Sequence, residues 1–455
     1  MLKLSISKEK RESLIIRLIL TIAAVLGFSA FFVLSLFKAV DGFSTGANGA
    51  FVCTACVLIL LASAVFFTFK TDLKSHISFF CILSVTAAAL SFRLFMFDYA
   101  SGDYGSFLSV WVSQMRGMSF KEAITTPIGD YNMPYLYFLA LFSRLGLNDL
   151  YLIKLLSVVF DFILAFAATK MVSLFKKSDE AIVLSFALFL FAPTLFLNSA
   201  FWGQCDVIYT ALCLIALYFA FRNKGALSVV FFALAFSFKI QSIFILPIII
   251  FLIIKRKISL TQILLFPVTF FATLLPAILC GRNFYDTFSI YINQTSSYPY
   301  LTLNCPTLWA LIPDNQDNFA IFGTAAIFVA GAAVLVFSLF VFLKRDKLNK
   351  TLLLDCAFIF TLIIPFLLPR MHERYFYLAE SLSIIYVFLH KDRLFVAPAL
   401  TLTGFCVYSA YLFGNSIVNL EILSIINAFI IIYTLKKFYD DLYTKQTKIT
   451  KKECF

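Results

Sequence analysis

Long apolar runs alternate with short polar segments along almost the whole chain. A helix of about 20 apolar residues crosses the hydrocarbon core of a bilayer, so each run predicts a membrane-spanning helix. The pattern therefore predicts an all-α polytopic membrane protein with about fourteen transmembrane helices. These are expected at 14–37, 50–69, 77–97, 149–172, 181–200, 206–222, 225–238, 242–255, 260–280, 319–344, 351–368, 374–390, 394–413 and 417–437.

Two places in this pattern need a separate interpretation. The apolar stretch 225–255 is divided by Lys239 and Gln241, which predicts two short helices that meet at a membrane surface. The apolar segment 134–146 is too short to span, so we expect it to lie in the outer leaflet or to dip into it.

The composition supports a bilayer as the solvent. Of the 455 residues, 61% are hydrophobic and 14% are charged, whereas soluble domains are about 25% charged. The ten cysteines lie mostly in apolar runs, and although Cys53 and Cys56 have a CxxC spacing, no second Cys or His pair completes the four-ligand pattern of a zinc site. We therefore predict no metal site and no cofactor, although the sequence leaves metal dependence and a disulfide among the outward cysteines open.

The distribution of basic residues predicts the orientation in the membrane. With a cytoplasmic N-terminus, nearly every Lys/Arg cluster falls on the cytoplasmic side, as the positive-inside rule requires. This explains the net charge of +12 without nucleic-acid binding. The predicted regions are N-terminal transmembrane helices (1–97), an outward loop with amphipathic helices (98–148), a transmembrane core (149–437) with outward loops at 201–206, 281–318 and 369–376, and a basic cytoplasmic tail (438–455).

The first candidate for chemistry is Asp103, in the sequence Ser-Gly-Asp-Tyr just beyond the third span. A carboxylate at this position suits a general base that deprotonates a hydroxyl group. The competing interpretation is a helix N-cap, because an amphipathic stretch at 107–115 follows directly.

Two further polar segments face the same side in the predicted topology. Asp130 and Tyr131 precede a helix that begins near Pro134, and Trp202, Gln204 and Asp206 lie at the mouth of a span. A ligand-binding site is the functional interpretation of these side chains. Capping turns and an interfacial aromatic anchor are the alternatives.

Basic residues on the outward face run against the charge rule and therefore need an explanation. Arginine and lysine near a membrane surface are suited to a phosphate group, whereas snorkelling or an Arg–Glu pair is the alternative. The predicted phosphate-binding residues are Lys239, Arg370, His372 and Arg374, with Gln241 and Glu373 as neighbouring polar residues.

Five segments of the chain read SGDYGSFLSVWVSQM, GDYNMPYLYFLALFS, FWGQCDVIYTALCLIALYF, FSFKIQSIFILP and PRMHERYFYLAE. In this order they resemble motifs of the GT-C glycosyltransferases, which take sugars from polyprenyl-phosphate carriers, and the resemblance covers about 95–390. The chain resembles bacterial proteins related to the second mannosyltransferase of GPI-anchor synthesis and, more distantly, dolichyl-phosphate-glucose-dependent glucosyltransferases. The resemblance implies that the acceptor or the sugar is bound by Asp130, Tyr131, Trp202, Gln204, Asp206, Gln241 and Glu373. The chain departs from the common pattern at its start, where two spans precede the helix that leads to Asp103 and one is usual.

The resemblance implies that Asp103 is the catalytic base of an inverting, single displacement at the anomeric carbon. The expected partners are a polyprenyl-phosphate-hexose donor, with mannose or glucose, a glycan or glycolipid acceptor, and membrane lipids. The expected location is the bacterial plasma membrane, with the active site facing outward. A lipid-linked sugar flippase or a glycan polymerase remains the alternative, and the sequence shows neither an inverted repeat nor a nucleotide-binding motif.

Overall fold

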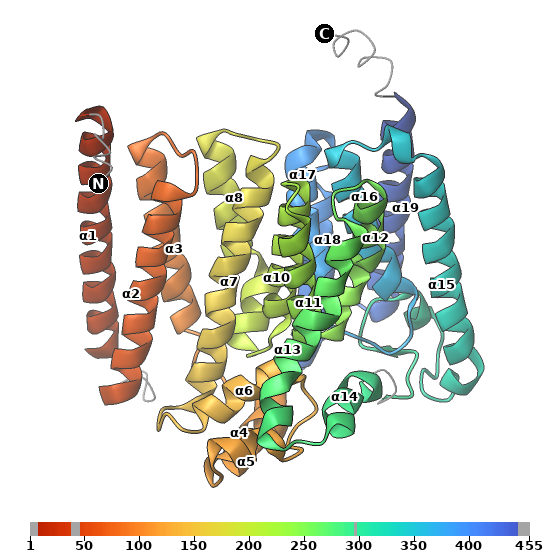
Figure 1. Ribbon diagram of the computed structural model, residues 1–455, viewed down its shortest axis with the longest axis horizontal. Helices are drawn as coiled ribbons and strands as arrows, with labels where there is room; N and C mark the ends of the chain where they lie inside the picture. Colours follow the sequence, from red (N-terminus) through yellow and green to blue (C-terminus); the bar gives the residue numbers. More distant parts are fainter. Residues whose placement is uncertain (1–7, 38–45, 295–297, 445–455) are drawn as a thin grey trace. The chain divides into compact units, whose positions relative to one another are not determined.

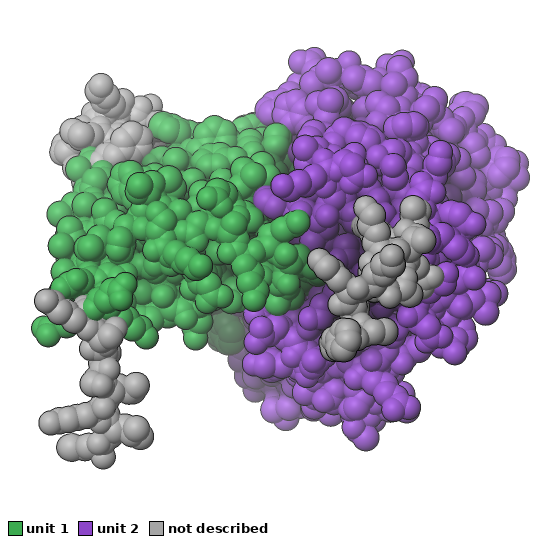
Figure 2. All heavy atoms as spheres, turned by 90° about the horizontal axis from the view of Figure 1, so that it is seen from above, with its two compact units in different colours: residues 1–120, 138–207 green, residues 121–137, 208–455 purple. Residues whose placement is uncertain are grey.

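The computed structural model describes residues 8–37, 46–294 and 298–444, and it is almost entirely helical (Figure 1). The chain divides into two compact units, coloured separately in Figure 2. Unit 1 comprises residues 1–120 and 138–207, and unit 2 comprises residues 121–137 and 208–455. The boundaries fall inside α5 (Phe120–Thr125), α6 (Met133–Phe142) and α10 (Asp206–Phe221).

The long helices of unit 1 run side by side in Figure 1 and pack on one another. Three of them begin at N-terminal caps: the Ser75, Asn148 and Ser178 side chains accept hydrogen bonds from backbone amides of the first turn, which stabilises helix starts. The helices are α1 (Lys8–Phe37), α2 (Gly46–Phe69), α3 (His76–Leu94), α7 (Asp149–Ser173) and α8 (Asp179–Phe191), followed by α9 (Pro193–Phe196) and the π-helix η2 (Leu197–Phe201).

The predicted amphipathic stretch is helical. It forms a π-helix, η1 (Tyr104–Leu108), that continues into α4 (Ser109–Arg116). Leu108 and Met115 are buried, whereas Phe107 and Val110 are exposed apolar side chains. That this segment forms an outward loop of the membrane protein stays a prediction.

Hydrogen bonds join loops of unit 1 at both ends of its long helices. At one end, the Asp179 carboxylate accepts hydrogen bonds from the backbone amides of Lys74 and Ser75. Both segments are predicted cytoplasmic loops. At the other end, the Ser101 hydroxyl donates to the Trp202 carbonyl at 2.8 Å, which joins two predicted outward loops.

Unit 2 contains the remaining helices and one small parallel sheet. The predicted break at Lys239 is confirmed: α11 ends at Phe238, and Lys239 has extended backbone angles before the 3₁₀ helix η3 begins. The helices are α11 (Gly225–Phe238), η3 (Ile240–Ile245), α12 (Leu246–Ile254), η4 (Leu260–Leu264), α13 (Leu265–Cys280), α14 (Phe284–Asn293), η5 (Leu308–Leu311), α15 (Phe319–Leu343), η6 (Arg345–Lys347), α16 (Lys350–Leu367), α17 (Tyr377–Leu389), η7 (Lys391–Arg393), α18 (Val396–Phe413) and α19 (Leu420–Thr444).

The loops of unit 2 also separate into two groups. The strands β1 (Thr302–Leu303) and β2 (Met371–His372) pair in parallel, and this brings the predicted outward loops 281–318 and 369–376 together. Among the predicted cytoplasmic segments, the Lys257 ammonium donates to the Asn223 side chain at 2.8 Å, and Arg393 pairs with Asp441.

Nine helices of the described residues are long and apolar enough to cross a membrane, or ten if α8 and the helical segment Pro193–Phe201, bent by 50°, form one span. The chain is thus a multi-pass membrane protein by helix length and composition. The other four predicted spans are apolar helices of 10–17 residues, so the number fourteen stays a prediction. Helix α19 continues to Thr444, past the predicted start of the tail at residue 438, and residues 445–455 lie outside the described part.

Candidate active site

The carboxylate of Asp103 is bound by two side chains that lie about a hundred residues further along the chain. Trp202 Nε1 donates to Asp103 Oδ2 at 3.0 Å, and Gln204 Nε2 donates to the same oxygen at 2.6 Å. Trp202 and Gln204 are fully buried, and Asp103 is half-buried. The structure therefore brings together residues from two motifs that the sequence left separate.

The capping interpretation of Asp103 does not fit this arrangement. Asp103 precedes η1, but its side chain makes no capping hydrogen bond. Instead, the Ser101 hydroxyl accepts from the Tyr104 amide at 3.2 Å. The carboxylate thus points to Trp202 and Gln204 rather than to the helix that it precedes.

The backbone around Gly203 places both donors. Gly203 has φ +80°, a conformation that side chains with a Cβ rarely adopt. The Ser157 hydroxyl of α7 donates to the Gln204 carbonyl at 2.7 Å, and Ser101 binds the Trp202 carbonyl. The serines were not among the predicted site residues, because a single serine beside an apolar run gives no distinctive sequence signal.

Asp206, a predicted sugar- or acceptor-binding residue, has a structural partner. It is fully buried, and Asn198 Nδ2 donates to its carboxylate at 3.1 Å. A buried carboxylate needs such hydrogen bonds. This placement favours the structural alternative that the sequence left open for Asp206.

The residue that follows Asp103 also contacts a charged group. The Tyr104 hydroxyl donates to Asp149 at 3.3 Å, and Arg116 pairs with the other oxygen of this carboxylate at 3.4 Å. Burial, and then the negative charge of Asp149, raise the pKa of Tyr104 to about 12. Tyr104 therefore stays a neutral hydrogen-bond donor at physiological pH.

The second group of predicted site residues lies in unit 2, around Glu373. Arg374 donates to Glu373 Oε1 at 2.8 Å, and His372 Nδ1 lies 3.8 Å from Oε2. Burial alone would raise the pKa of Glu373, but the neighbouring His372 and the positive charge of Arg374 outweigh it and lower the pKa. Glu373 is therefore an ionised, buried anchor for Arg374.

Aromatic rings connect the other predicted cations to this group. The His372 ring lies 5.2 Å from the Tyr375 ring, and the Lys239 ammonium lies 5.8 Å from the Tyr375 centroid and 6.0 Å from that of Tyr209. Arg370 differs, because its guanidinium stacks over Phe319 at 4.7 Å.

The predicted binding residue Asp130 belongs to the same unit. Burial raises its pKa, while the positive charges of Arg374 and His372 act in the opposite direction. Gln294 Nε2 donates both to the Asp130 carbonyl at 2.7 Å and to the Asn132 side chain at 2.9 Å. The loop that carries Asp130 is thus held in unit 2, within electrostatic reach of the cations.

Tyr131 and Gln241 complete the predicted binding residues. The Tyr131 ring packs edge-on against Tyr135, with centroids 5.0 Å apart. Gln241 is buried, and within the described residues its Oε1 has no hydrogen-bond partner. A buried amide oxygen without a donor is costly, so Gln241 is suited to accept a hydrogen bond from a bound molecule.

The predicted site residues thus form two groups. Asp103, Trp202 and Gln204 belong to unit 1, and Lys239, His372, Glu373 and Arg374 belong to unit 2 with Asp130. No protein-family model matches the chain, and no curated protein matches it.

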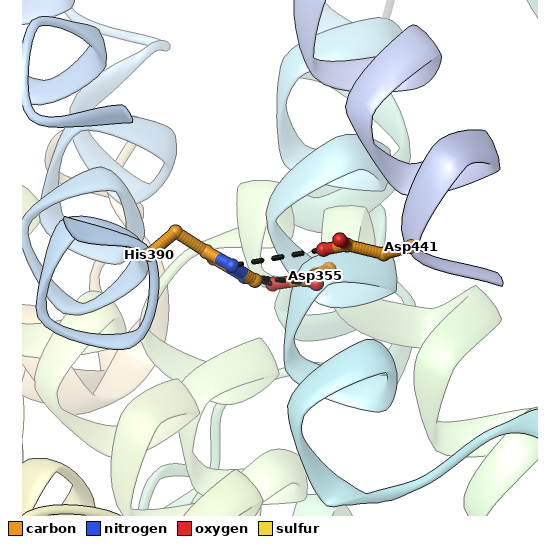
Figure 3. Close-up of side chains that lie close together, drawn as sticks. All are labelled: Asp355, His390 and Asp441. Atoms are coloured by element: carbon orange, nitrogen blue, oxygen red, sulfur yellow. Dashed lines mark hydrogen bonds and ion pairs between the residues drawn. The ribbon is translucent and has the colours of Figure 1, made fainter. Parts of the chain in front are cut away.

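One cluster of metal-ligating side chains occurs in the described residues, and it lies elsewhere in unit 2. Asp355, His390 and Asp441 point toward one another, with one ligand atom from each within 4.8 Å of the others (Figure 3). His390 follows the end of α17, whereas His372–Arg374 precede its start. The 13-residue helix separates the two groups by about 20 Å.

The side chains of this cluster already bind one another and Arg393. His390 Nε2 lies 2.9 Å from Asp355, Nδ1 lies 3.7 Å from Asp441, and Arg393 donates to Asp441 at 2.7 Å. We therefore interpret the cluster as a buried ion network that ties the ends of α16, α17 and α19 together. The sequence did not reveal it, because its members are widely separated, but ionisable residues inside apolar runs are a usable signal.

The structure tests the disulfide that the sequence left open among the outward cysteines. The nine cysteines of the described residues, including Cys205, Cys280 and Cys305, are free thiols. The structure therefore contains no disulfide among these three outward cysteines, and the option that the sequence left open is not realised in the part of the chain that is described.

Proposed function

We propose that this chain is an inverting glycosyltransferase of the extracytoplasmic face of a bacterial plasma membrane. It transfers a hexose, mannose or glucose, from a polyprenyl-phosphate carrier to a hydroxyl group of a glycan or glycolipid acceptor. The observation that carries the proposal is the convergence of Trp202 and Gln204 on one oxygen of Asp103. Two of the five glycosyltransferase-like segments thereby contribute to a single carboxylate site.

Asp103 acts as the general base in this proposal. Its carboxylate takes the proton of the acceptor hydroxyl as the hydroxyl oxygen attacks the anomeric carbon. The bond between that carbon and the phosphate oxygen breaks, and the electron pair leaves with polyprenyl phosphate. Trp202 and Gln204 hold the carboxylate plane in a fixed orientation, and because both donors are neutral they leave its negative charge in place.

The cations of unit 2 supply the binding site for the leaving phosphate. Arg374 presents a planar guanidinium that suits phosphate geometry, and Lys239 adds a compact positive charge. Glu373 fixes Arg374 through the 2.8 Å ion pair. Positive charge that is held in place stabilises the negative charge that develops on the departing phosphate.

The decisive experiment uses purified protein in liposomes with radiolabelled polyprenyl-phosphate mannose and glucose, and with glycolipids extracted from bacterial membranes as acceptors. We expect the release of polyprenyl phosphate to require an acceptor and the label to move to the glycolipid fraction. A flippase would instead move the intact lipid-linked sugar between leaflets without releasing polyprenyl phosphate. Folded protein that transfers neither sugar, in the presence of acceptor, would contradict the proposal.

A further inference from the structure

Lys154 in the first part of α7 is buried, and its ammonium donates three hydrogen bonds to backbone carbonyls of one turn. Its ammonium donates to the carbonyls of Met96 at 2.6 Å, Phe97 at 3.1 Å and Tyr99 at 2.6 Å. A lysine ammonium has three donors, so all of them are directed at the segment that follows α3. Burying a lysine costs free energy unless it is compensated in this way.

The turn bound by Lys154 leads directly to the proposed base. Tyr99 lies four residues before Asp103, and Ser101 between them is tied to the Trp202 carbonyl. An ammonium that fixes the carbonyls at 96, 97 and 99 therefore fixes the backbone from which Asp103 projects.

The same face of α7 also holds the donors of Asp103. Ser157 is three residues after Lys154, on the same side of the helix, and it binds the Gln204 carbonyl. The stem of Lys154 lies 3.8 Å from the position that a Cβ on Gly203 would occupy. One helical surface thus supports both chain segments that meet at Asp103.

We propose that Lys154 is a positioning residue for Asp103. It holds the turn at 96–99 while Ser157 holds the segment 202–204, so that the carboxylate meets Trp202 and Gln204 in one geometry. This inference rests on the proposed function, because Asp103 matters to the reaction only if it is the base. A lysine that served stability alone would leave turnover by the folded protein unchanged.

The test compares Lys154→Met, which keeps the length of the side chain and removes the ammonium, with Lys154→Arg and Ser157→Ala. Lys170→Met is the matched control, because Lys170 lies on the same helix and its ammonium donates to the Lys70 carbonyl near the other end. Per mole of folded protein, we expect Lys154→Met to lower kcat by about 10- to 100-fold, the range expected for a catalytic group displaced by up to 1 Å. Donor KM should not change, and Lys170→Met should retain wild-type kcat.

Hydrogen exchange of the backbone amides in 96–105 gives a second readout that does not depend on activity. We expect faster exchange in this segment for Lys154→Met and wild-type exchange for Lys170→Met. Folded Lys154→Met with wild-type kcat would overturn the proposal. If Lys154→Met does not fold, wild-type kcat in both Lys154→Arg and Ser157→Ala would overturn it, and a lower kcat with unchanged donor KM would support it.

These measurements separate failure of this inference from failure of the proposed function. If the wild-type protein transfers no sugar, the proposed function fails, and hydrogen exchange decides whether Lys154 positions the segment. Faster exchange at 96–105 would then support the positioning role, and unchanged exchange would overturn it.

Discussion

The half-buried carboxylate of Asp103 and the buried carboxylate of Glu373 are bound by different kinds of side chain. Asp103 is bound by neutral donors, the indole of Trp202 and the amide of Gln204. Glu373 is bound by a cation, the guanidinium of Arg374. Neutral donors orient a carboxylate and preserve its charge, whereas an ion pair cancels charge and positions the cation. From this comparison we propose that Asp103 is the base and that Arg374 binds the phosphate.

The largest effect is expected for Asp103→Asn. Both donors bind the same oxygen, Oδ2, so the carbonyl oxygen of an asparagine can keep both hydrogen bonds while the basic group is lost. Transfer should fall about 100-fold or more, the contribution of a positioned base. Thermal stability should barely change. Transfer assays and thermal denaturation of the purified variant measure the two quantities.

Controls for this prediction are Asp98→Asn and Asp130→Asn. Asp98 accepts a hydrogen bond from the Tyr151 hydroxyl, and Asp130 lies in unit 2. We expect both variants to retain more transfer than Asp103→Asn. Loss of turnover in Asp130→Asn, with turnover kept in Asp103→Asn, would show that the base is Asp130.

The next effect is expected for Arg374→Ala, which removes the proposed phosphate ligand. Loss of a charge-assisted hydrogen bond should weaken donor use by about 1–3 kcal/mol, measured as kcat/KM for the donor. Arg374→Lys should restore only part of it, because lysine cannot bind a phosphate in a bidentate manner. Arg345→Ala, in η6 at the predicted cytoplasmic end, is the matched control and should behave as wild type.

Hydrophobic patterning predicted the helical segments of this fold well, for a physical reason. A bilayer requires a continuous apolar stretch for each span, so the positions of α2, α7 and α15 follow from the sequence. The same pattern predicts the break at Lys239, where a charge interrupts the apolar run. Hydropathy cannot decide whether a helix as short as α17, with 13 residues, crosses the membrane, because packing against neighbours sets its depth.

The contacts among the candidate site residues could not be predicted from the sequence. Asp103, Trp202 and Gln204 are separate candidates in the sequence, which does not show that donors about a hundred residues away reach one carboxylate oxygen. Lys154 was missed because it lies in the predicted span 149–172 and its partners are backbone carbonyls, which have no sequence signature. Its position near membrane depth was the available signal, since such a lysine is costly and usually has a role.

A smaller effect is expected for Glu373→Gln, which removes the anchor of Arg374 and leaves Arg374 in place. The fall in donor kcat/KM should correspond to about 0.5–1.5 kcal/mol, the net contribution of one hydrogen bond.

The same variant tests the pH dependence of stability. The pKa of Glu373 is lower in the folded protein than in the unfolded chain, so the ionised form stabilises the fold above the unfolded pKa. This stabilisation is lost as the pH falls through the folded pKa. Wild type should therefore be more stable than the variant at pH 7, and the difference in melting temperature should disappear well below about pH 4.3, the ordinary pKa of glutamate.

The smallest effect on transfer is expected for Asp355→Asn, in the ion network of Figure 3. His390 lies 2.9 Å from Asp355, and removing one charge from a buried pair destabilises a fold by about 3–5 kcal/mol. The variant should melt at a lower temperature, while kcat and donor KM of the folded protein stay at wild-type values, since the network lies at the far end of α17 from Arg374.

Treatment of the wild-type protein with a chelator distinguishes the ion network from a metal site. We expect an unchanged melting temperature, because Arg393 and His390 already bind the two carboxylates. A melting temperature that drops with the chelator and recovers with Zn²⁺ would show that the cluster binds a metal ion.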